Sequence, residues 1–264
     1  MHSENLQQFN RFTSTAINAA QSAGSILRRF FARSIAIKYK GKIDPVTIAD
    51  IQSQKKAISI LKQAFPTHTF MGEEGKSTGK RSDPHCWIID PLDGTVNFIH
   101  GIPFFSVSIA LYMNHEIVSA VVYAPMLDEL FVAQKSSGAW CNGKPIRVSS
   151  ASSLTRSLAV TGFPYSIHAH SSRILKRFKN IITKTQGVRR FGSASIDLCY
   201  VACGRFDAFW EEHLKPWDVA AGSLIVEEAG GNVSDYSNKN NYLFGSSILA
   251  TNSSIHKPLL SLLR

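Results

Sequence analysis

Residues 87–98, with the sequence WIIDPLDGTVNF, constrain the fold most strongly because an apolar run leads directly into two carboxylates. The run at 87–89 is apolar at every position, which is typical of a strand buried on both faces. Asp-Pro and Asp-Gly follow at once and predict a turn. Aspartate beside glycine is common in ordinary turns, so Asp90 and Asp93 become functional candidates only if other parts of the chain support them.

Length and composition indicate a globular chain with a sizeable core. The chain has 264 residues, of which 44% are hydrophobic and 18% charged, so it can form one large domain or two closely packed smaller ones. No apolar stretch reaches the roughly 18 to 20 residues of a membrane span. The N-terminus, MHSENLQQFNRFTSTAINAAQ, lacks the apolar core of a signal peptide. We therefore expect a cytoplasmic protein with no membrane partner.

The four cysteines are too few to form a disulfide framework in a chain of this length. They are Cys86, Cys141, Cys199 and Cys203. They form no CxxC pair and have no histidine cluster beside them, so zinc is not indicated. We expect reduced, mostly buried thiols.

The formal net charge of +10 is unevenly distributed along the chain. No Asp or Glu occurs from Phe131 to Ile196, and Lys and Arg are densest at 173–190. Such a region can be a solvated basic face, can steer an anionic substrate, or can bind nucleic acid or a protein complex. No zinc finger, aromatic RNA-binding signature or basic tail accompanies it.

Hydrophobic periodicity predicts helices and an antiparallel sheet in the first half of the chain. Residues 4–33 are apolar at helical spacing, and a second helix follows Asp50, where TIAD resembles a capping box. Alternation in FFSVSIALYM and IVSAVVYAP predicts a hairpin, and ELFVAQK predicts a third antiparallel strand.

The second half alternates strands with helices, which is typical of an α/β arrangement. Strands are predicted at 158–164, 205–210 and 246–251, and helices at 171–185, 193–203, 217–229 and the C-terminus. The seam falls near 142–153, a stretch rich in Ser, Gly and Pro. We expect an N-terminal α+β half at 1–145 and a C-terminal α/β half at 146–264.

Several carboxylates lie at strand ends and helix starts, where solvent-facing charge is not expected. They are Asp50, Glu73, Glu74, Asp90, Asp93 and Asp218. Each has an ordinary explanation as a helix cap or turn residue when it is taken alone. Together, however, clustered carboxylates repel unless a cation compensates them, and oxygen-only ligands indicate Mg²⁺, Mn²⁺ or Ca²⁺ rather than zinc.

Gly94 and Thr95 follow the two acids and add groups that suit a phosphate. Glycine lets the backbone approach a ligand closely, and Thr95 offers a hydroxyl and an N–H. If a helix begins just beyond, its N-terminus favours a phosphate. Acids for a metal and amides for a phosphate describe a metal-dependent phosphoryl-transfer site.

Four segments together resemble the signature blocks of the inositol monophosphatase family, in that family's order. They are DPVTIAD, GEEG, WIIDPLDGTVNFIHGIPFFSVSIAL and WDVAAGSLIVEEAGG, and they extend from about residue 44 to 231. The third block is highly specific, whereas the second and fourth are weak singly. The stretch RRFGSASIDLCYVACGRFDAFWEEHLKPWD is similar to bacterial members.

This resemblance implies a layered α-β-α-β-α phosphatase fold, usually assembled as a homodimer and active with two or three Mg²⁺ ions, with Mn²⁺ as an alternative. By the family pattern, the metal ligands fall on Glu73, Asp90, the Leu92 carbonyl, Asp93 and Asp218. The resemblance further implies that Asp50, Glu73 and Thr95 orient the attacking water. The groups that face the phosphate or alcohol fall on Asp93, Gly94, Thr95, Ser193, Ala194 and Glu211.

The expected reaction is hydrolysis of inositol 1-phosphate and related polyol phosphates to the alcohol and phosphate. Related enzymes with the same blocks cleave fructose 1,6-bisphosphate, histidinol phosphate or adenosine 3′,5′-bisphosphate. Val96-Asn97-Phe98 after Asp-Gly-Thr favours the inositol group, because histidinol phosphatases usually carry Lys-Ser-Phe there. Lys215, where animal members tend to carry histidine, leaves the sugar specificity open. A different class of function, binding of nucleic acid or a protein complex through the basic 131–196 region, also remains open.

Overall fold

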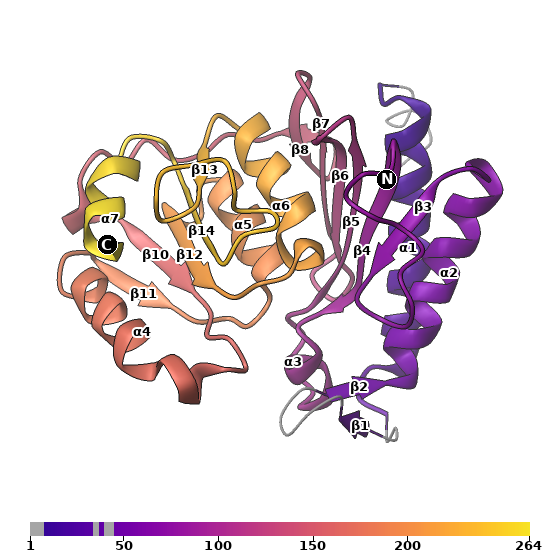
Figure 1. Cartoon of the computed structure of the whole chain (residues 1–264), viewed down its shortest axis with the longest axis horizontal. Coiled ribbons are helices and arrows are strands. Elements are labelled where there is room, and N and C mark those ends of the chain that lie inside the picture. Colours follow the sequence, from indigo (N-terminus) through magenta and orange to yellow (C-terminus); the bar gives the residue numbers. More distant parts are fainter. Residues whose placement is uncertain (1–7, 34–36, 40–44) are drawn as a thin grey trace.

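The computed structural model describes residues 8–33, 37–39 and 45–264, and it is built in five layers (Figure 1). The helices are α1 (Arg11–Phe30), α2 (Ile48–Ala64), α3 (Thr95–Ile99), α4 (Ile167–Ile182), α5 (Ala194–Ala202), α6 (Pro216–Glu228) and α7 (His256–Leu263), with a 3₁₀ turn at Leu154–Arg156. Within the described residues, no helix combines the length and apolar character needed to span a bilayer.

Most of the strands form two sheets. The strands are β1 (Ile37–Tyr39), β2 (Pro45–Thr47), β3 (Thr69–Gly72), β4 (His85–Asp93), β5 (Ser106–Met113), β6 (Glu116–Ala124), β7 (Glu129–Gln134), β8 (Gly138–Cys141), β9 (Lys144–Pro145), β10 (Leu158–Thr161), β11 (Gly187–Arg189), β12 (Ala208–Glu212), β13 (Asn232–Ser234) and β14 (Ser247–Thr251). Strands β3 to β9 lie in sequence order in a seven-stranded sheet, antiparallel except for the β3–β4 pair. The second sheet has the order β11-β10-β12-β14-β13, with β10 parallel to β11 and β12.

Helices cover both faces of each sheet. Helices α1 and α2 pack on one face of the seven-stranded sheet, α5 and α6 lie between the two sheets, and α4 and α7 lie together over the outer face of the second (Figure 1). Three buried apolar clusters fill the spaces between these five layers. The predicted α-β-α-β-α sandwich is therefore confirmed.

Strand β4 shows why residues 87–89 are apolar at every position. Cys86 and Ile88 belong to the cluster between the sheets, whereas Trp87 and Ile89 belong to the cluster under α1 and α2. All four side chains are buried because successive residues of a strand point to opposite faces, and both faces of β4 are covered.

Most predicted elements are present, with shifted ends. The start of the predicted 4–33 helix falls partly in residues outside the described ranges, and α1 is defined from Arg11. Helix α2 begins at Ile48, and Asp50 lies inside its first turn, where Thr47 and Asp50 form the predicted capping box. The predicted 104–125 hairpin and the third strand are β5, β6 and β7.

The second half differs more in its boundaries. Strand β12 begins three residues later than the predicted 205–210 strand and ends on Glu211 and Glu212, two acids that are 6% and 7% exposed. The apolar pattern ends at Trp210, so hydrophobicity alone does not reveal these two positions. We keep the division near residue 145 as a proposal, supported by the end of β9 at Pro145 and the start of β10 at Leu158.

Candidate active site

The two acids of the DPLD stretch lie within the end of β4, not in a turn after it as predicted. Asp90 pairs with Ser108 and Asp93 with Ser106, so three residue steps on β4 match two on β5. Such a bulge adds one residue and reverses the alternation of the side chains beyond it. Asp93 is thereby turned to the same face of the sheet as Asp90, which explains why the acids are three positions apart rather than two.

Asp93 is fixed by the start of α5. Its Oδ2 atom accepts hydrogen bonds from Ser193 Oγ at 2.7 Å, Ser195 N at 2.7 Å and Ser195 Oγ at 2.5 Å. The Ser195 hydroxyl also lies 2.6 Å from Ser106 Oγ on β5. Sequence reasoning did not single out Ser195, because its partner lies 102 positions away.

Asp218 is placed by the first turn of α6. Pro216 starts the helix, and Asp218 Oδ2 accepts the Lys215 N–H at 2.6 Å, as acids near a helix N-terminus do. The Ser108 hydroxyl donates to the Trp217 carbonyl at 3.2 Å and links this turn to β5. Asp218 is therefore carried to the end of β4 by the helix that lies between the two sheets.

Asp50 and Thr95 form a buried pair behind the end of β4. Asp50 Oδ2 accepts the Thr47 N–H at 2.8 Å, whereas the Thr95 hydroxyl lies 3.3 Å from Asp50 Oδ1 and 3.0 Å from the Leu92 carbonyl oxygen. Burial raises the pKa of Asp50, although these hydrogen bonds oppose the increase. The neighbouring Pro91 carbonyl accepts the Ser53 hydroxyl at 2.8 Å, which fixes the backbone of this segment to α2.

Glu73 lies in the loop after β3, and α2 holds that loop through Gln54. Gln54 accepts the Glu74 N–H at 3.0 Å and donates to the Glu74 carbonyl. The Glu73 N–H donates to the Ile89 carbonyl at 3.2 Å, which joins the loop to β4. The GEEG block therefore has a defined backbone next to the two acids of β4.

One cavity of about 530 Å³ brings these elements together. Of the residues to which the family resemblance assigns a role, all except Asp50 line it: Glu73, Asp90, Leu92, Asp93, Gly94, Thr95, Ser193, Ala194, Glu211 and Asp218. Glu74, the other candidate acid, does not line it. Asp50 is fully buried and reaches the cavity only through its contact with Thr95. Gly94 has a φ of 97°, a left-handed conformation that glycine adopts without strain, and it precedes the five-residue helix α3.

The acids of the cavity repel one another. Burial first, and then the negative charges of Glu73, Asp93 and Asp218, raise the pKa of Asp90 well above its ordinary value. Burial and the charge of Asp93 do the same to the pKa of Asp218. Burial also raises the pKa of Asp93, against the hydrogen bonds from Ser193 and Ser195. Such an arrangement favours a compensating cation.

The donor set fits a hard cation, because it consists of carboxylates and one backbone carbonyl. Across the described ranges, no group of three or more His, Cys, Asp or Glu side chains is close enough together to hold a metal ion. Uncompensated carboxylates repel, so they are expected to close up only around a cation. The structure thus places suitable oxygen donors around one cavity, but not at the distances of a complete metal coordination shell.

Two further charged residues of the cavity, Arg190 and Asp197, were not singled out from the sequence. Gly192 leaves room for the Arg190 guanidinium, because a Cβ at that position would lie 2.5 Å from Arg190 Nη1. Asp197 lies in the first turn of α5 and is 1% exposed. Arg190 lies in a basic segment and Asp197 in an apolar one, so the neighbouring residues in the sequence do not indicate that either side chain lines a cavity.

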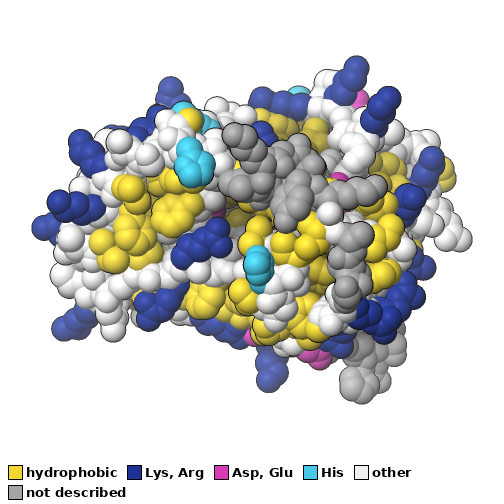
Figure 2. All heavy atoms as spheres, turned by 90° about the horizontal axis from the view of Figure 1, so that it is seen from below, with side chains coloured by type: hydrophobic (Ala, Val, Ile, Leu, Met, Phe, Trp, Pro, Cys, Tyr) yellow, Lys and Arg dark blue, Asp and Glu magenta, His cyan; other side chains and the backbone are white. Residues whose placement is uncertain are grey.

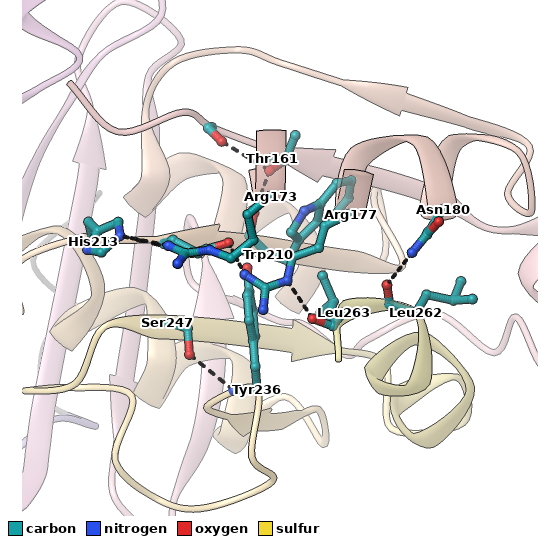
Figure 3. A network of polar contacts seen from close by, with 12 residues as sticks. Thr161, Arg173, Arg177, Asn180, Trp210, His213, Tyr236, Ser247, Leu262 and Leu263 are labelled. Carbon is teal, nitrogen blue, oxygen red and sulfur yellow. Dashed lines mark hydrogen bonds and ion pairs between the residues drawn. The ribbon is translucent and has the colours of Figure 1, made fainter. Parts of the chain in front are cut away.

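A polar network supports the strand end that carries Glu211. The adjacent Glu212 accepts hydrogen bonds from Arg173 and Arg177 of α4, and Arg177 also donates to the Leu263 carbonyl. Figure 3 shows Arg177 extending from α4 towards Leu263 and lying beside the Tyr236 ring. Part of the basic stretch at 173–190 therefore neutralises a buried acid.

Comparison with known proteins decides the family. The family model described as the inositol monophosphatase family matches residues 9–264. The chain belongs to the inositol monophosphatase family. It is accordingly a phosphatase of that family, and the resemblance seen in the four sequence blocks is confirmed.

Individual relatives cover nearly the whole chain. It is 43% identical to the Nus factor SuhB of Pseudomonas aeruginosa, over 93% of each protein. It is 41% identical to the inositol-1-monophosphatase of Caulobacter vibrioides, over 94% of this chain and 99% of that one. The crystal structure of the extragenic suppressor protein suhB from Bartonella henselae superposes with a TM-score of 0.92 at 40% identity, covering 97% of this chain and 99% of that one.

Proposed function

We propose that the chain is a Mg²⁺-dependent phosphomonoesterase that releases phosphate from inositol 1-phosphate and related polyol phosphates. The observation that carries this proposal is the gathering of Asp90, Asp93 and Asp218 around one cavity, beside Gly94 and Thr95. Buried acids that raise one another's pKa require a cation to remain charged, and a phosphate ester carries negative charge that the same cation attracts.

The residues that would hold the metal are Glu73, Asp90, the Leu92 carbonyl, Asp93 and Asp218. Two or three Mg²⁺ ions per site are proposed, with Mn²⁺ as an alternative, because both accept oxygen ligands. When bound, Mg²⁺ acidifies water and offsets negative charge on the phosphate and on the leaving alcohol.

Residues of the chain itself orient the reactants. The N–H groups of Gly94 and Thr95 hold the phosphate oxygens. The Thr95 hydroxyl, placed between Asp50 Oδ1 and the Leu92 carbonyl, orients the attacking water together with Glu73. The leaving alcohol faces Asp93, Glu211 and the backbone at 193–194.

A phosphate-release assay tests the proposal directly. Inositol 1-phosphate should be hydrolysed with Mg²⁺ and not in EDTA. Asp93→Asn and Asp218→Asn should each lower turnover by about 100-fold or more, because each removes one charge from the metal ligands, while the circular dichroism spectrum stays unchanged. Near-normal activity in both variants would contradict the assignment.

The same assay separates the other substrates. Fructose 1,6-bisphosphate, adenosine 3′,5′-bisphosphate and histidinol phosphate remain alternatives for the same cavity. Glu211, which lines the cavity and is 6% exposed, favours a polyol, because a carboxyl accepts hydrogen bonds from hydroxyl groups. A higher kcat/KM for any of these three esters than for inositol 1-phosphate would reassign the substrate.

We also propose a homodimer, as the family resemblance implies. Exposed large apolar side chains support a contact surface, among them Ile102 at 48% and Phe191 at 39%. Figure 2 shows hydrophobic side chains gathered between basic ones on one face of the molecule. Sedimentation of the wild type at the mass of two chains, and of Ile102→Asp at the mass of one, is the expected result.

A second candidate function is binding of nucleic acid or a protein complex through the basic 131–196 region. Two observations favour it: no Asp or Glu occurs from Phe131 to Ile196, and one relative is named Nus factor SuhB. Lys176, Lys179 and Lys184 are exposed, whereas Arg177 is engaged with Glu212. RNA or DNA binding that weakens as salt rises would support this function, and no binding at low salt would exclude nucleic acid.

A further inference from the structure

Asp197 is a buried acid of the cavity that the proposed reaction leaves without a role. It lies in the first turn of α5, lines the cavity and is 1% exposed. Its backbone N–H donates to the Ser193 carbonyl at 3.0 Å, so the helix fixes its position. Within the described residues, its Oδ1 atom is buried and has no hydrogen-bond partner.

This lack of a partner separates Asp197 from the acids assigned to the metal. Asp90 accepts the Leu92 N–H at 2.9 Å, Asp93 accepts from two serines, and Asp218 accepts the Lys215 N–H. A buried carboxyl oxygen without a partner is destabilising, so its presence in a residue that lines a cavity favours a ligand that supplies the missing donor.

Glu211 lies in the same cavity and resembles Asp197 in this respect. In the described part of the chain, no residue donates a hydrogen bond to its carboxyl group, although the side chain is buried. The two acids are close enough that the charge of Glu211 raises the pKa of Asp197, and the Arg190 guanidinium acts on both in the opposite direction. The cavity therefore presents two carboxyl groups without a hydrogen-bond donor from the described residues, and the Arg190 guanidinium lies near both.

We propose that Asp197 is a substrate-binding residue that, with Glu211, receives two separate hydroxyl groups of the alcohol portion. This inference rests on the proposed phosphatase function and narrows its substrate class. The substrate is a phosphate monoester of a polyol with at least two free hydroxyl groups. A second phosphate in this part of the substrate would meet two acids, which disfavours a bisphosphate.

The test compares two esters in the wild type and in Asp197→Leu, which keeps the number of side-chain heavy atoms. Inositol 1-phosphate carries hydroxyl groups, and ethyl phosphate carries none. In the variant, KM for inositol 1-phosphate should rise about tenfold, as expected for loss of one hydrogen bond, with kcat within about twofold. The kcat/KM for ethyl phosphate should stay unchanged.

The melting temperature, Tm, distinguishes substrate binding from a purely structural role, because loss of a structural residue would lower it. Asp197→Leu should keep or raise the Tm, because it removes a buried acid without a partner. The matched control is Asp207→Leu, since Asp207 is also buried but accepts hydrogen bonds from Ser149 Oγ and from Leu158 N, the latter at 2.6 Å. The control should lower the Tm and leave both KM values unchanged.

The outcomes separate the two proposals. If the wild type hydrolyses inositol 1-phosphate and Asp197→Leu has the same KM for it, the role proposed for Asp197 is wrong and the phosphatase function stands. The same conclusion follows if the variant loses kcat/KM equally for both esters. A Tm that falls as far as in Asp207→Leu, or a variant that does not fold, also overturns it. If the wild type releases phosphate from neither ester with Mg²⁺, both proposals fail.

Discussion

Ser195 donates both its backbone N–H and its hydroxyl to Oδ2 of Asp93, a residue 102 positions earlier in the chain. This double contact joins the end of β4 to the start of α5, and hence the first sheet to the helical layer that separates the sheets. It also fixes the orientation of a carboxylate that is proposed to bind both metal and substrate. The serine thus acts on the site through Asp93 rather than through the substrate.

Ser195→Ala should lower kcat/KM for inositol 1-phosphate by about tenfold, because one of the hydrogen bonds that orient Asp93 is lost. The matched control is Ser223→Ala in α6. Ser223 is also buried, but its hydroxyl has no hydrogen-bond partner in the described part of the chain. The control should keep full activity and an equal or higher Tm. Equal activities in the two variants would show that the Ser195 hydroxyl does not position Asp93.

Gly162→Ala should displace Glu211 without unfolding the protein. A Cβ at Gly162 would collide with the Glu211 carboxyl group, which is the end of a flexible side chain and can move aside. We expect KM for inositol 1-phosphate to rise about tenfold while the Tm changes little, because a hydrogen bond to the substrate is lost and the core is not.

Gly187→Ala provides the comparison for Gly162→Ala, because the nearest atom to its added Cβ is Arg189 Nη1 at 3.3 Å. This variant should retain the wild-type KM. If Gly162→Ala also retains it, Glu211 does not contact the alcohol.

Sequence patterns predict those parts of the site that depend only on neighbouring residues in the chain. The apolar run at 87–89 predicts a strand buried on both faces, and TIAD predicts the capping box of Asp50. The DPLD spacing identifies two acids but not the β-bulge that turns them to one face. That bulge depends on the pairing of Asp90 with Ser108 and of Asp93 with Ser106, and β5 lies further along the chain.

Contacts between distant segments cannot be read from spacing. Asp197 looks like an ordinary acid in the first turn of a helix, where the helix dipole favours it. Asp197 becomes a candidate for function only because α5 lies between the two sheets and brings this residue to the wall of the cavity. Likewise, α4 has the sequence of a solvated basic helix, although its Arg177 neutralises Glu212 from another layer.

Arg177→Met should destabilise the fold more than Arg173→Met. The Arg177 side chain is 19% exposed and contacts both Glu212 and the Leu263 carbonyl, so its loss leaves a buried acid poorly compensated. We expect a loss of about 3 kcal/mol in the free energy of unfolding. The Arg173 side chain is 49% exposed, and its replacement should cost less than about 1 kcal/mol. Urea unfolding of the two variants measures the difference, and equal losses would contradict this account.

The stability of the metal-free protein should fall as pH rises, because Glu211 holds a proton in the folded state. Burial, together with the charge of Asp218, raises the pKa of Glu211 from 4.5 to about 8. The unfolded chain releases this proton near pH 4.5, so the stabilising contribution is complete below that pH and is lost as pH rises through about 8. In EDTA, the Tm should therefore decrease between pH 5.5 and 8.5. Glu211→Gln should show a shallower decrease over the same range, and an unchanged slope in that variant would mean that Glu211 is already charged at pH 5.5.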